Sequence, residues 1–275
     1  MHFKKSIFFC LMASLLVSGL VSSCKKKDST PDPEQTLDQP KGKLKSFKEG
    51  SGIESVYVYK KDGQVDYKSV FSFGSLIGKI QYVFVGGKLQ RSEYTNLQAD
   101  GSMKLVFNFV YEYQREHFIG FTTVPVMTGP ATPRLTSGKY TYDGSGKLST
   151  YALWSPVDDP VYVQEYPIWQ STFDAKGNIV QMVQTNYDKN GKALGTSKTK
   201  YEYDDKPNPW YLLGEPENPL VHFSVNNIVK MTYEGPAGAT FMEQYTYEYN
   251  AEGKPSKKYK TFHNVTSLVN EFSYY

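Results

Sequence analysis

The sequence predicts an all-β protein, a long antiparallel meander of hairpins that curls into an open barrel or wrap. Two observations support this class. A short turn unit recurs along the chain, and the segments between the turns alternate aromatic with polar side chains. We expect roughly a dozen or more strands from the spacing of these turns. A two-sheet sandwich built from the same hairpins is the alternative.

The turn unit consists of an aromatic residue, Asp or Asn, two further residues and Gly. It occurs in full at residues 142–147, 173–178, 187–192 and 249–254, and in a shorter form at 201–204. The Asp or Asn side chain can accept a hydrogen bond from a nearby backbone amide, and Gly can take positive φ without steric cost. The unit therefore predicts a type I turn followed by a left-handed residue, which joins two antiparallel strands.

A calcium-binding loop is a second interpretation of the same units, through Asp174, Asp188 and Asp204. Each unit supplies only one acid, whereas calcium takes six to eight oxygen ligands. The hairpin interpretation is therefore preferred, and no metal site is predicted.

The segments between the turns have the alternation of strands. Tyr245, Tyr247 and Tyr249 fall on one face of an extended chain, and Tyr201 and Tyr203 do the same. Tyrosine suits such a face because its ring buries apolar area while its hydroxyl can stay wet. Further strand-like segments lie at residues 56–59, 70–73, 80–85 and 104–111. A helix near residues 47–57 is weakened by Gly50, Gly52 and β-branched residues.

Three proline-rich insertions interrupt the hairpins, at residues 124–136, 155–167 and 206–220. Proline cannot donate a hydrogen bond to a central ladder, so we expect loops or edge crossings there. Loops carry binding and catalytic residues more often than the strands that position them.

The N-terminal residues predict export. Residues 1–23 combine Lys4 and Lys5 with an apolar run too short for an ordinary membrane span, which is typical of a signal peptide. The sequence Val21-Ser22-Ser23-Cys24 resembles the lipobox of bacterial lipoproteins, which implies cleavage before Cys24 and its lipidation. Residues 24–45 lack apolar side chains almost entirely and predict a flexible tether, and residues 46–275 predict a single domain.

Composition excludes several classes of function. Without Lys4 and Lys5, the 31 basic residues fall to 29 against 28 acidic ones, a net charge of +1 that predicts no nucleic-acid partner. Cys10 lies in the signal segment and Cys24 at the lipidation site, so residues 46–275 contain no cysteine. Disulfides, thiol catalysis and cysteine-ligated metals are thereby excluded from the predicted domain.

The recurring units resemble the YD repeats of RHS-type proteins, which implies an RHS-like wrap. Residues 201–210, 224–227 and 247–255 together resemble the ending of a group of Bacteroidota lipoproteins. The resemblance covers about the last 135 residues and the lipobox, and the unit at Tyr203 departs from it by lacking the glycine. It implies an envelope-anchored β protein on the outer membrane with no chemistry to inherit, and the toxin role of long RHS proteins is not carried over.

No catalytic pattern stands out. His117, His222 and His263 lie far apart in sequence, and no nucleophile elbow, phosphate loop or dinucleotide fingerprint occurs. The adjacent acids at residues 158–159 and 204–205 point apart in an extended chain and lie beside prolines, as turn acids do. We therefore predict a protein that is not an enzyme and uses no cofactor, with a hydrolase assembled from dispersed carboxylates as the alternative.

Tryptophans are the remaining candidates for binding. Trp154, Trp169 and Trp210 flank or occupy the proline-rich insertions, where exposed rings could stack on a sugar. The alternative is that they cover the ends of the sheet. Asn208, Asn226 and Asn227 are expected to serve turns rather than a polar groove.

These observations lead to one functional expectation. The protein is predicted to be a non-enzymatic lipoprotein of the bacterial outer membrane, held to the membrane by the lipid on Cys24. It would act as a binding or scaffold module whose partner is a glycan or another envelope protein. The sequence does not choose between the periplasmic and the outer surface.

Overall fold

The computed structural model describes residues 39–126, 137–154, 165–188, 190–211, 213 and 219–275. The signal segment, Cys24 and most of the predicted tether lie outside these residues. Strand β1 begins at Leu44, two residues before the boundary predicted at residue 46. Gln39 already bonds to the backbone of Tyr59, which ties the chain to the domain before that strand.

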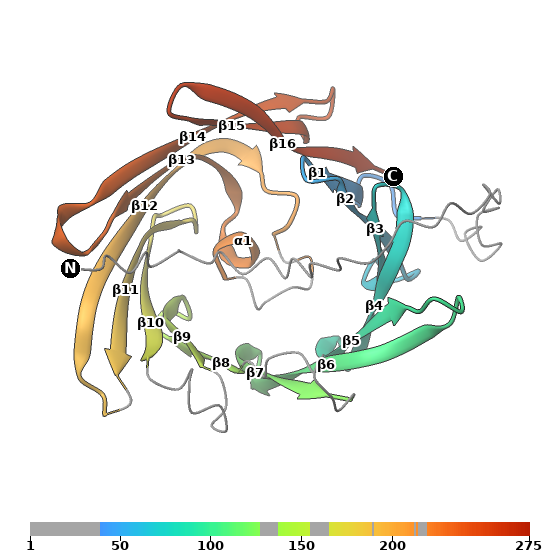
Figure 1. Ribbon diagram of the computed structural model, residues 1–275, viewed down its shortest axis with the longest axis horizontal. Coiled ribbons are helices and arrows are strands. Elements are labelled where there is room, and N and C mark those ends of the chain that lie inside the picture. The colour runs from blue at the N-terminus through green and yellow to red at the C-terminus, as the bar shows by residue number, and fades with distance from the viewer. Residues whose placement is uncertain (1–38, 127–136, 155–164, 189, 212, 214–218) are drawn as a thin grey trace. The chain divides into compact units, whose positions relative to one another are not determined.

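The described residues form one closed antiparallel barrel in which every strand pairs with its neighbours in sequence (Figure 1). Its sixteen strands are β1 Leu44–Glu49, β2 Ile53–Tyr59, β3 Val65–Ser72, β4 Ser75–Val85, β5 Lys88–Leu97, β6 Met103–Gln114, β7 His117–Pro125, β8 Ser137–Tyr142, β9 Leu148–Trp154, β10 Glu165–Phe173, β11 Ile179–Asp188, β12 Ala193–Pro207, β13 Asn226–Glu234, β14 Thr240–Tyr249, β15 Pro255–Phe262 and β16 Val265–Tyr274. The prediction of an all-β meander is confirmed, and the sandwich alternative is not adopted.

The barrel is closed rather than open, because the first strand pairs with the last. Leu44 lies opposite Tyr274 and Phe47 opposite Phe272 across β1 and β16. Two tyrosine hydroxyls tie the strands at this seam to β2: Tyr59 of β2 donates to the carbonyl of Leu44 in β1 at 2.8 Å, and Tyr275, after β16, donates to the carbonyl of Tyr57 in β2 at 2.8 Å. Closure pairs backbone groups that an open sheet would leave exposed along its edges.

The four complete turn units form hairpin turns as predicted. In each, the Oδ1 atom of the first Asp or Asn accepts a backbone hydrogen bond, for example from Lys147 and Lys192. The glycine that follows has positive φ in each, between 75° and 96°. The prediction is wrong for residues 201–204, which continue strand β12. That unit lacks the glycine, so nothing lets the chain reverse there.

Helices play a small part. No described helix is long and apolar enough to cross a membrane. Residues 47–57 form strands β1 and β2 with a turn at Gly52, whose φ is +88°, instead of the helix considered from sequence. A five-residue helix, α1 (Pro219–Phe223), and a single 3₁₀ turn, η2 (Pro236–Gly238), stand between the strands.

The three proline-rich insertions are only partly loops. Residues 127–136 and 155–164 lie outside the described residues. Strands extend into all three insertions, since β7 runs to Pro125, Pro167 pairs with Asn186 in β11, and Pro207 at the end of β12 pairs with Asn226. Pro167 lies just before the segment of β10 that pairs with β9, so it has a ladder partner on one side only. The third insertion carries α1 into the ring of strands (Figure 1).

Two glycines of one turn provide a test of the hairpin interpretation. Gly146 has φ of +80°, and a Cβ there would lie 3.3 Å from His117, whereas Gly144 is outside the left-handed region and has open space. We expect Gly146→Ala to lower the free energy of unfolding by about 1 kcal/mol or more, and Gly144→Ala to change it by less than about 0.5 kcal/mol. Equilibrium urea unfolding of both variants measures this. Equal effects would contradict the turn geometry.

Candidate functional site in the barrel lumen

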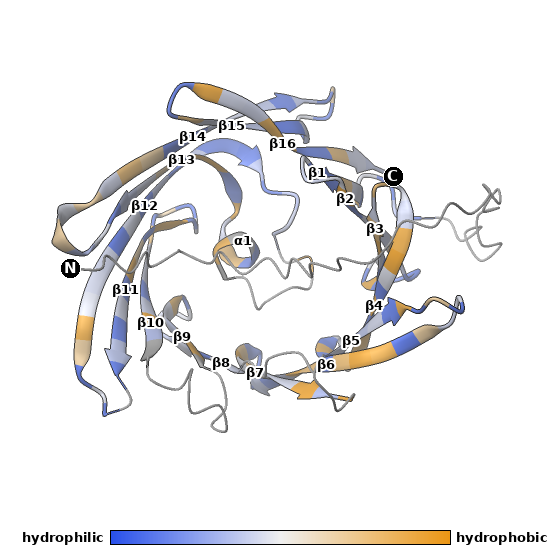
Figure 2. Cartoon of the chain, viewed as in Figure 1, coloured by the Kyte–Doolittle hydropathy of each residue, from blue (hydrophilic) through white to orange (hydrophobic). Residues whose placement is uncertain are grey.

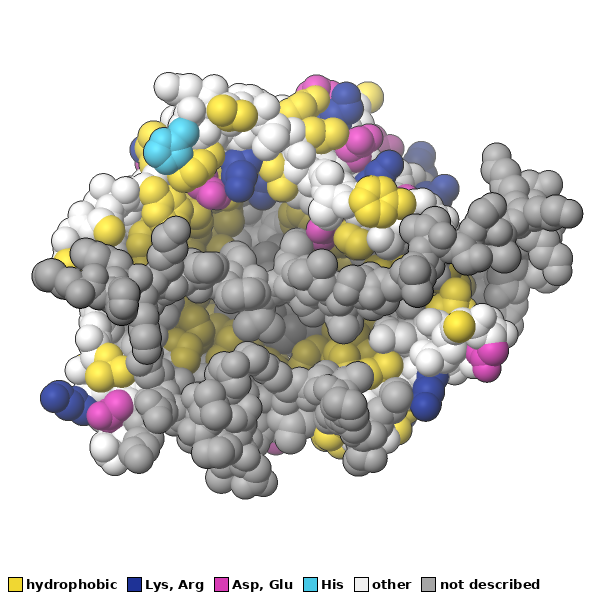
Figure 3. Space-filling view, viewed as in Figure 1, with side chains coloured by type: hydrophobic (Ala, Val, Ile, Leu, Met, Phe, Trp, Pro, Cys, Tyr) yellow, Lys and Arg dark blue, Asp and Glu magenta, His cyan; other side chains and the backbone are white. Residues whose placement is uncertain are grey.

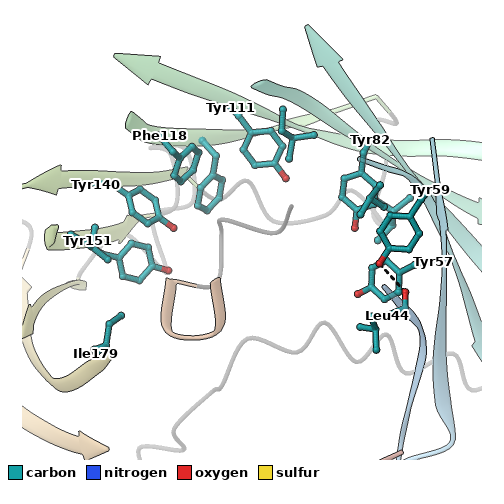
Figure 4. Close-up of a cluster of buried hydrophobic side chains, with 14 of the residues drawn as sticks. Leu44, Tyr57, Tyr59, Tyr82, Tyr111, Phe118, Tyr140, Tyr151 and Ile179 are labelled. Atoms are coloured by element: carbon teal, nitrogen blue, oxygen red, sulfur yellow. Dashed lines mark hydrogen bonds between the residues drawn. The ribbon is translucent and has the colours of Figure 1, made fainter. Parts of the chain in front are cut away.

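Aromatic side chains line the inside of the barrel. Tyr57, Tyr82 and Tyr140 are 0%, 1% and 2% exposed. In Figure 4 the labelled rings follow the wall and are directed toward the space that holds α1. Directly opposite residues in a ladder point to the same face, so this luminal face can be followed from strand to strand. Hydrophobic side chains line the hollow inside the ring in the space-filling view (Figure 3).

Trp169 belongs to this lining. It lies opposite Tyr151 in the β9–β10 ladder, and the two rings stack with centroids 4.8 Å apart. Tyr151 in turn contacts Tyr140 at 4.9 Å, and Tyr140 contacts Phe118 at 4.6 Å. Four neighbouring strands thus contribute one continuous row of rings, in geometries that favour aromatic pairs.

Trp210 joins the lining from another direction. It follows β12 and is half-buried, with its ring edge-on to Phe47 at 5.6 Å and to Phe272 at 5.0 Å. Phe47 and Phe272 are the pair that faces the lumen across the closing seam. The side chain of Trp154 lies outside the described residues. The structure therefore places two of the three predicted binding tryptophans in the luminal lining.

A buried network of polar side chains, here called the asparagine buckle, connects the end of β12 and the start of β13 to the turn before β11. Asn178 and Asn226, from β11's leading turn and from β13, exchange two hydrogen bonds, of 3.1 Å and 2.8 Å. Asn227 donates to Asp204, and the hydroxyl of Tyr249 donates to the same carboxylate. Burial of these groups is tolerated because each has hydrogen-bond partners.

The buckle also fixes the ends of the inserted segment. The amide of Asn208 donates to the carbonyl of Ser224 at 2.8 Å, and the hydroxyl of Tyr203 donates to the carbonyl of Ile179 at 2.6 Å. The ring of Phe223, at the end of α1, then lies 6.5 Å from that of Tyr140 on β8. The asparagines singled out from sequence therefore position α1, and they form no open groove.

Hydrogen bonds in the buckle affect the ionisation of its acids. Burial tends to raise the pKa of the Asp174 carboxyl, but hydrogen bonds from Asn178 outweigh burial and hold that pKa below its usual value. Burial raises the pKa of the Tyr203 hydroxyl well above its usual value. At neutral pH the buckle thus contains an ionised acid and a neutral phenol, as its hydrogen bonds require.

The outer face of the wall is polar and charged. Lys200 and Glu234 form an ion pair of 2.7 Å across β12 and β13, and Lys230 and Glu202 form another of 2.7 Å. Further pairs, such as that between Lys257 and Glu248 at 3.3 Å, lie on β14 and β15. Hydrophilic and hydrophobic residues alternate along the strands (Figure 2). Exposed ion pairs add little stability, but their place shows which face meets water.

Charged groups also occur inside the barrel, on β14 and β15. Lys258 lies opposite Tyr247, and Lys260 lies opposite Tyr245. The ammonium of Lys258 is 4.2 Å from the ring centre of Tyr245, close enough for a cation–π contact. Lys260 pairs with Glu243 at 3.5 Å. A further lysine on the luminal face, Lys68 of β3, lies opposite Tyr57 with its ammonium 5.7 Å from the centre of that ring. These charged groups interrupt an otherwise aromatic and hydroxyl-rich lining.

The acids and histidines considered from sequence have structural neighbours of their own in the described part of the chain. No group of three or more His, Cys, Asp or Glu side chains in them could hold a metal ion. Of the adjacent acids interpreted from sequence as turn acids, Asp204 and Asp205 lie in strand β12 instead. Asp204 accepts hydrogen bonds in the buckle and Asp205 is exposed beside Lys206, while residues 158–159 lie outside the described part. His117 lies beside Tyr142 and His263 beside Phe262, with neither next to a carboxylate among the pairs described.

The comparison with known proteins rests on structure. No family model matches the chain, and no curated protein matches its sequence. A porin-like protein from Bacteroides vulgatus has a similar structure, with a TM-score of 0.55 and 12% sequence identity, over 84% of this chain and 98% of that one. The two proteins share a fold. A porin-like protein from Bacteroides uniformis aligns over 86% of this chain and 98% of its own, with a TM-score of 0.47 and 8% identity.

The sequence does not distinguish the luminal lysines from surface lysines. In the segment Lys257-Lys258-Tyr259-Lys260, all three lysines look like solvated surface residues. Only the pairing of β15 with β14 separates Lys257, which faces Glu248 outside, from Lys258, which faces Tyr247 inside. A β-bulge between Glu248 and Tyr249 shifts the register of β14 against β15, and no local pattern in the sequence predicts this bulge.

The lysine inside the barrel should leave a signature in the pH dependence of stability. Burial lowers the pKa of Lys258 to about 8, with Glu243 opposing this shift and Lys260 adding to it; Tyr245 and Tyr247 also face the ammonium. From about pH 8 to the ordinary lysine pKa of 10.5, the unfolded chain holds a proton that the folded one lacks, so stability rises with pH.

We expect this rise to be absent in Lys258→Met and present in Lys257→Met, as measured by urea unfolding at several pH values. Above about pH 10 both variants should lose stability, because burial raises the pKa of tyrosines such as Tyr59 and Tyr274, and the unfolded chain ionises first. A rise that persists in Lys258→Met would contradict the assignment.

Proposed function

We propose that this protein is a non-enzymatic binding protein of the bacterial cell envelope that takes its ligand inside the barrel. The observation that carries the proposal is the polarity of the wall, which is aromatic inside and charged outside. An apolar surface that is sheltered from water by a polar shell is the usual setting of a small-molecule site.

The same polarity argues that the wall stands in water. Barrels that span an outer membrane present an apolar band to lipid and a polar lumen, and a lysine at the middle of the bilayer costs about 2–4 kcal/mol. Lys198, Lys200 and Lys230 lie within strands on the outer face here. We infer that the barrel shares its fold with porin-like proteins but uses its lumen as a binding compartment.

An envelope location is part of the proposal. It is supported by the lipobox at Cys24, by the export signal before it and by the fold shared with a Bacteroides porin-like protein. A lipid on Cys24 would hold the barrel at the outer membrane while the wall remains in water.

A glycan is the ligand that the tryptophans suggest. Trp169 and Trp210 line the lumen, where sugar rings could stack on aromatic faces. However, Trp169 already stacks on Tyr151, and Trp210 is half-buried between two phenylalanines. A glycan array would support this version if it finds a ligand whose binding is lost in Trp169→Ala.

The luminal site can be tested by filling it. Thr199 faces the lumen between Met182 and Tyr233, and its neighbour Lys200 faces outward toward Glu234. We expect the neutral apolar dye Nile red to bind the wild-type protein saturably and Lys200→Trp equally well. Thr199→Trp should lose the saturable binding, because its indole covers the apolar lining between Met182 and Tyr233 against which the dye would pack. Fluorescence titration measures binding, and circular dichroism confirms that both variants fold. Equal binding by both variants would refute a luminal site.

The anchor provides a separate test. We expect Cys24→Ser to release the protein from the membrane fraction of the producing bacterium and to abolish its labelling with radioactive palmitate. Ser23→Ala is the matched control, because it leaves the thiol in place and alanine is a small residue acceptable before the cleavage site. Unchanged fractionation of Cys24→Ser would contradict lipid anchoring.

A further inference from the structure

Lys258 is a cation placed inside an aromatic compartment. Its backbone lies opposite Tyr247 on one side and Asn270 on the other, both on the luminal face. Its ammonium is 4.2 Å from the ring centre of Tyr245 and 5.8 Å from that of Tyr247. Two aromatic faces therefore hold the charge within the lining.

The carboxylates on the same face already have partners. Glu49, which lies opposite Asn270, accepts a hydrogen bond from the hydroxyl of Ser51. Glu243 accepts a hydrogen bond from the hydroxyl of Tyr245 and pairs with Lys260 at 3.5 Å. Among the described residues, Lys258 forms no ion pair, in contrast to Lys257, which pairs with Glu248 outside the barrel. A cation that is partly withdrawn from water and lacks an anion attracts one, because charge interactions strengthen as the effective dielectric constant falls.

One end of the barrel is ringed by exposed apolar side chains. This apolar rim consists of the turns that follow the odd-numbered strands, together with the strand residues beside them. Fourteen large apolar side chains are exposed in the described residues. Eleven of them lie within four residues of those turns, and the three exceptions are Val85, Val110 and Tyr211. Phe73 and Val265, at 82% and 68% exposure, are the most exposed. The buckle and the segment that carries α1 lie at the opposite end.

We propose that the lumen binds a single-chain lipid with an anionic head group, with the head at Lys258, the chain along the aromatic lining and the apolar rim as its way in from a membrane. This assignment rests on the proposed luminal function and adds the chemical class of the ligand. The aromatic lining accounts for the chain, the unpaired ammonium for the charge, and the rim for contact with lipid. A glycan would use neither the ammonium nor the rim.

The first experiment compares palmitate with cetyl alcohol, which has the same chain and no charge, at pH 7. We expect saturable binding of palmitate by displacement of Nile red, and cetyl alcohol to bind at least about tenfold more weakly, as loss of a charged hydrogen bond implies. Lys258→Met should lose this difference and Lys258→Arg should keep it. Lys257→Met, which removes the neighbouring outer charge, should behave as the wild-type protein does.

Two further ligands define the head group. Lysophosphatidate tests whether a phosphate head serves as well as a carboxylate, and inorganic phosphate tests whether the anion alone suffices. Competition by inorganic phosphate as strong as that by either lipid would overturn the amphiphile assignment. So would equal binding of palmitate and cetyl alcohol by the wild-type protein, or a preference for palmitate that survives in Lys258→Met.

The outcomes separate this proposal from the one on which it rests. If neither lipid displaces Nile red while Thr199→Trp still abolishes dye binding, the lumen binds ligands but not this class. If dye binding is insensitive to Thr199→Trp, the luminal function itself fails.

The rim is tested by the rate of transfer. A fluorescent fatty acid is loaded into phosphatidylcholine vesicles, and its movement to the protein is followed by stopped flow. We expect Phe73→Asn combined with Val265→Thr to slow transfer several-fold while leaving the affinity for free palmitate unchanged. Asparagine is chosen because Phe73 has φ of +48°, which asparagine tolerates. The control is the double variant Val85→Thr with Val110→Thr, because both valines are exposed but lie outside the apolar rim. Equal transfer rates for both double variants would remove the rim from the proposal.

Discussion

The pairing of β1 with β16 is the constraint on which the rest of the structure depends. Without it the meander would be a curved sheet with two free edges, and its aromatic face would stay open to water. With it, a row of rings from Phe118 to Trp169 becomes the wall of an enclosed space. Burying each such ring stabilises the fold by about 1.5–3 kcal/mol. Because the barrel is closed, the rings of all strands are buried together.

Closure also gives the two faces of each strand different tasks. Thr199 and Tyr201 face inward from β12, while Lys198, Lys200 and Glu202 between and beside them form ion pairs outside. The asparagine buckle holds α1 inside the ring of strands. The binding compartment proposed here therefore arises from three features: the alternation along strands, the seam that closes them and the buckle at one end.

The sequence predicts the local features well and the long-range ones poorly. The turn glycines and alternating tyrosines dictate hairpins, because their physical causes act over a few residues. The closing contact between Ser46 and Ser273 spans 227 positions, and no local pattern encodes it. Nor does alternation reveal which face is inside, since membrane barrels place their apolar residues outward. The position of Lys258 in the lumen depends on both the closing contact and the inward face, whereas Trp169 and Trp210 were selected as binding candidates by residue type alone.

The seam has a consequence for how the chain reaches this structure. Every other strand pair joins neighbours in sequence, so hairpins can form as soon as their residues are available, and such local contacts form quickly. The last ladder requires β16 (Val265–Tyr274), so the ring cannot close until all fifteen preceding strands have been made and β16 is free to fold. Until then the tyrosine-rich face of a growing sheet is exposed, together with its edges. An exported chain of this design would thus be most vulnerable to aggregation just before its final strand arrives.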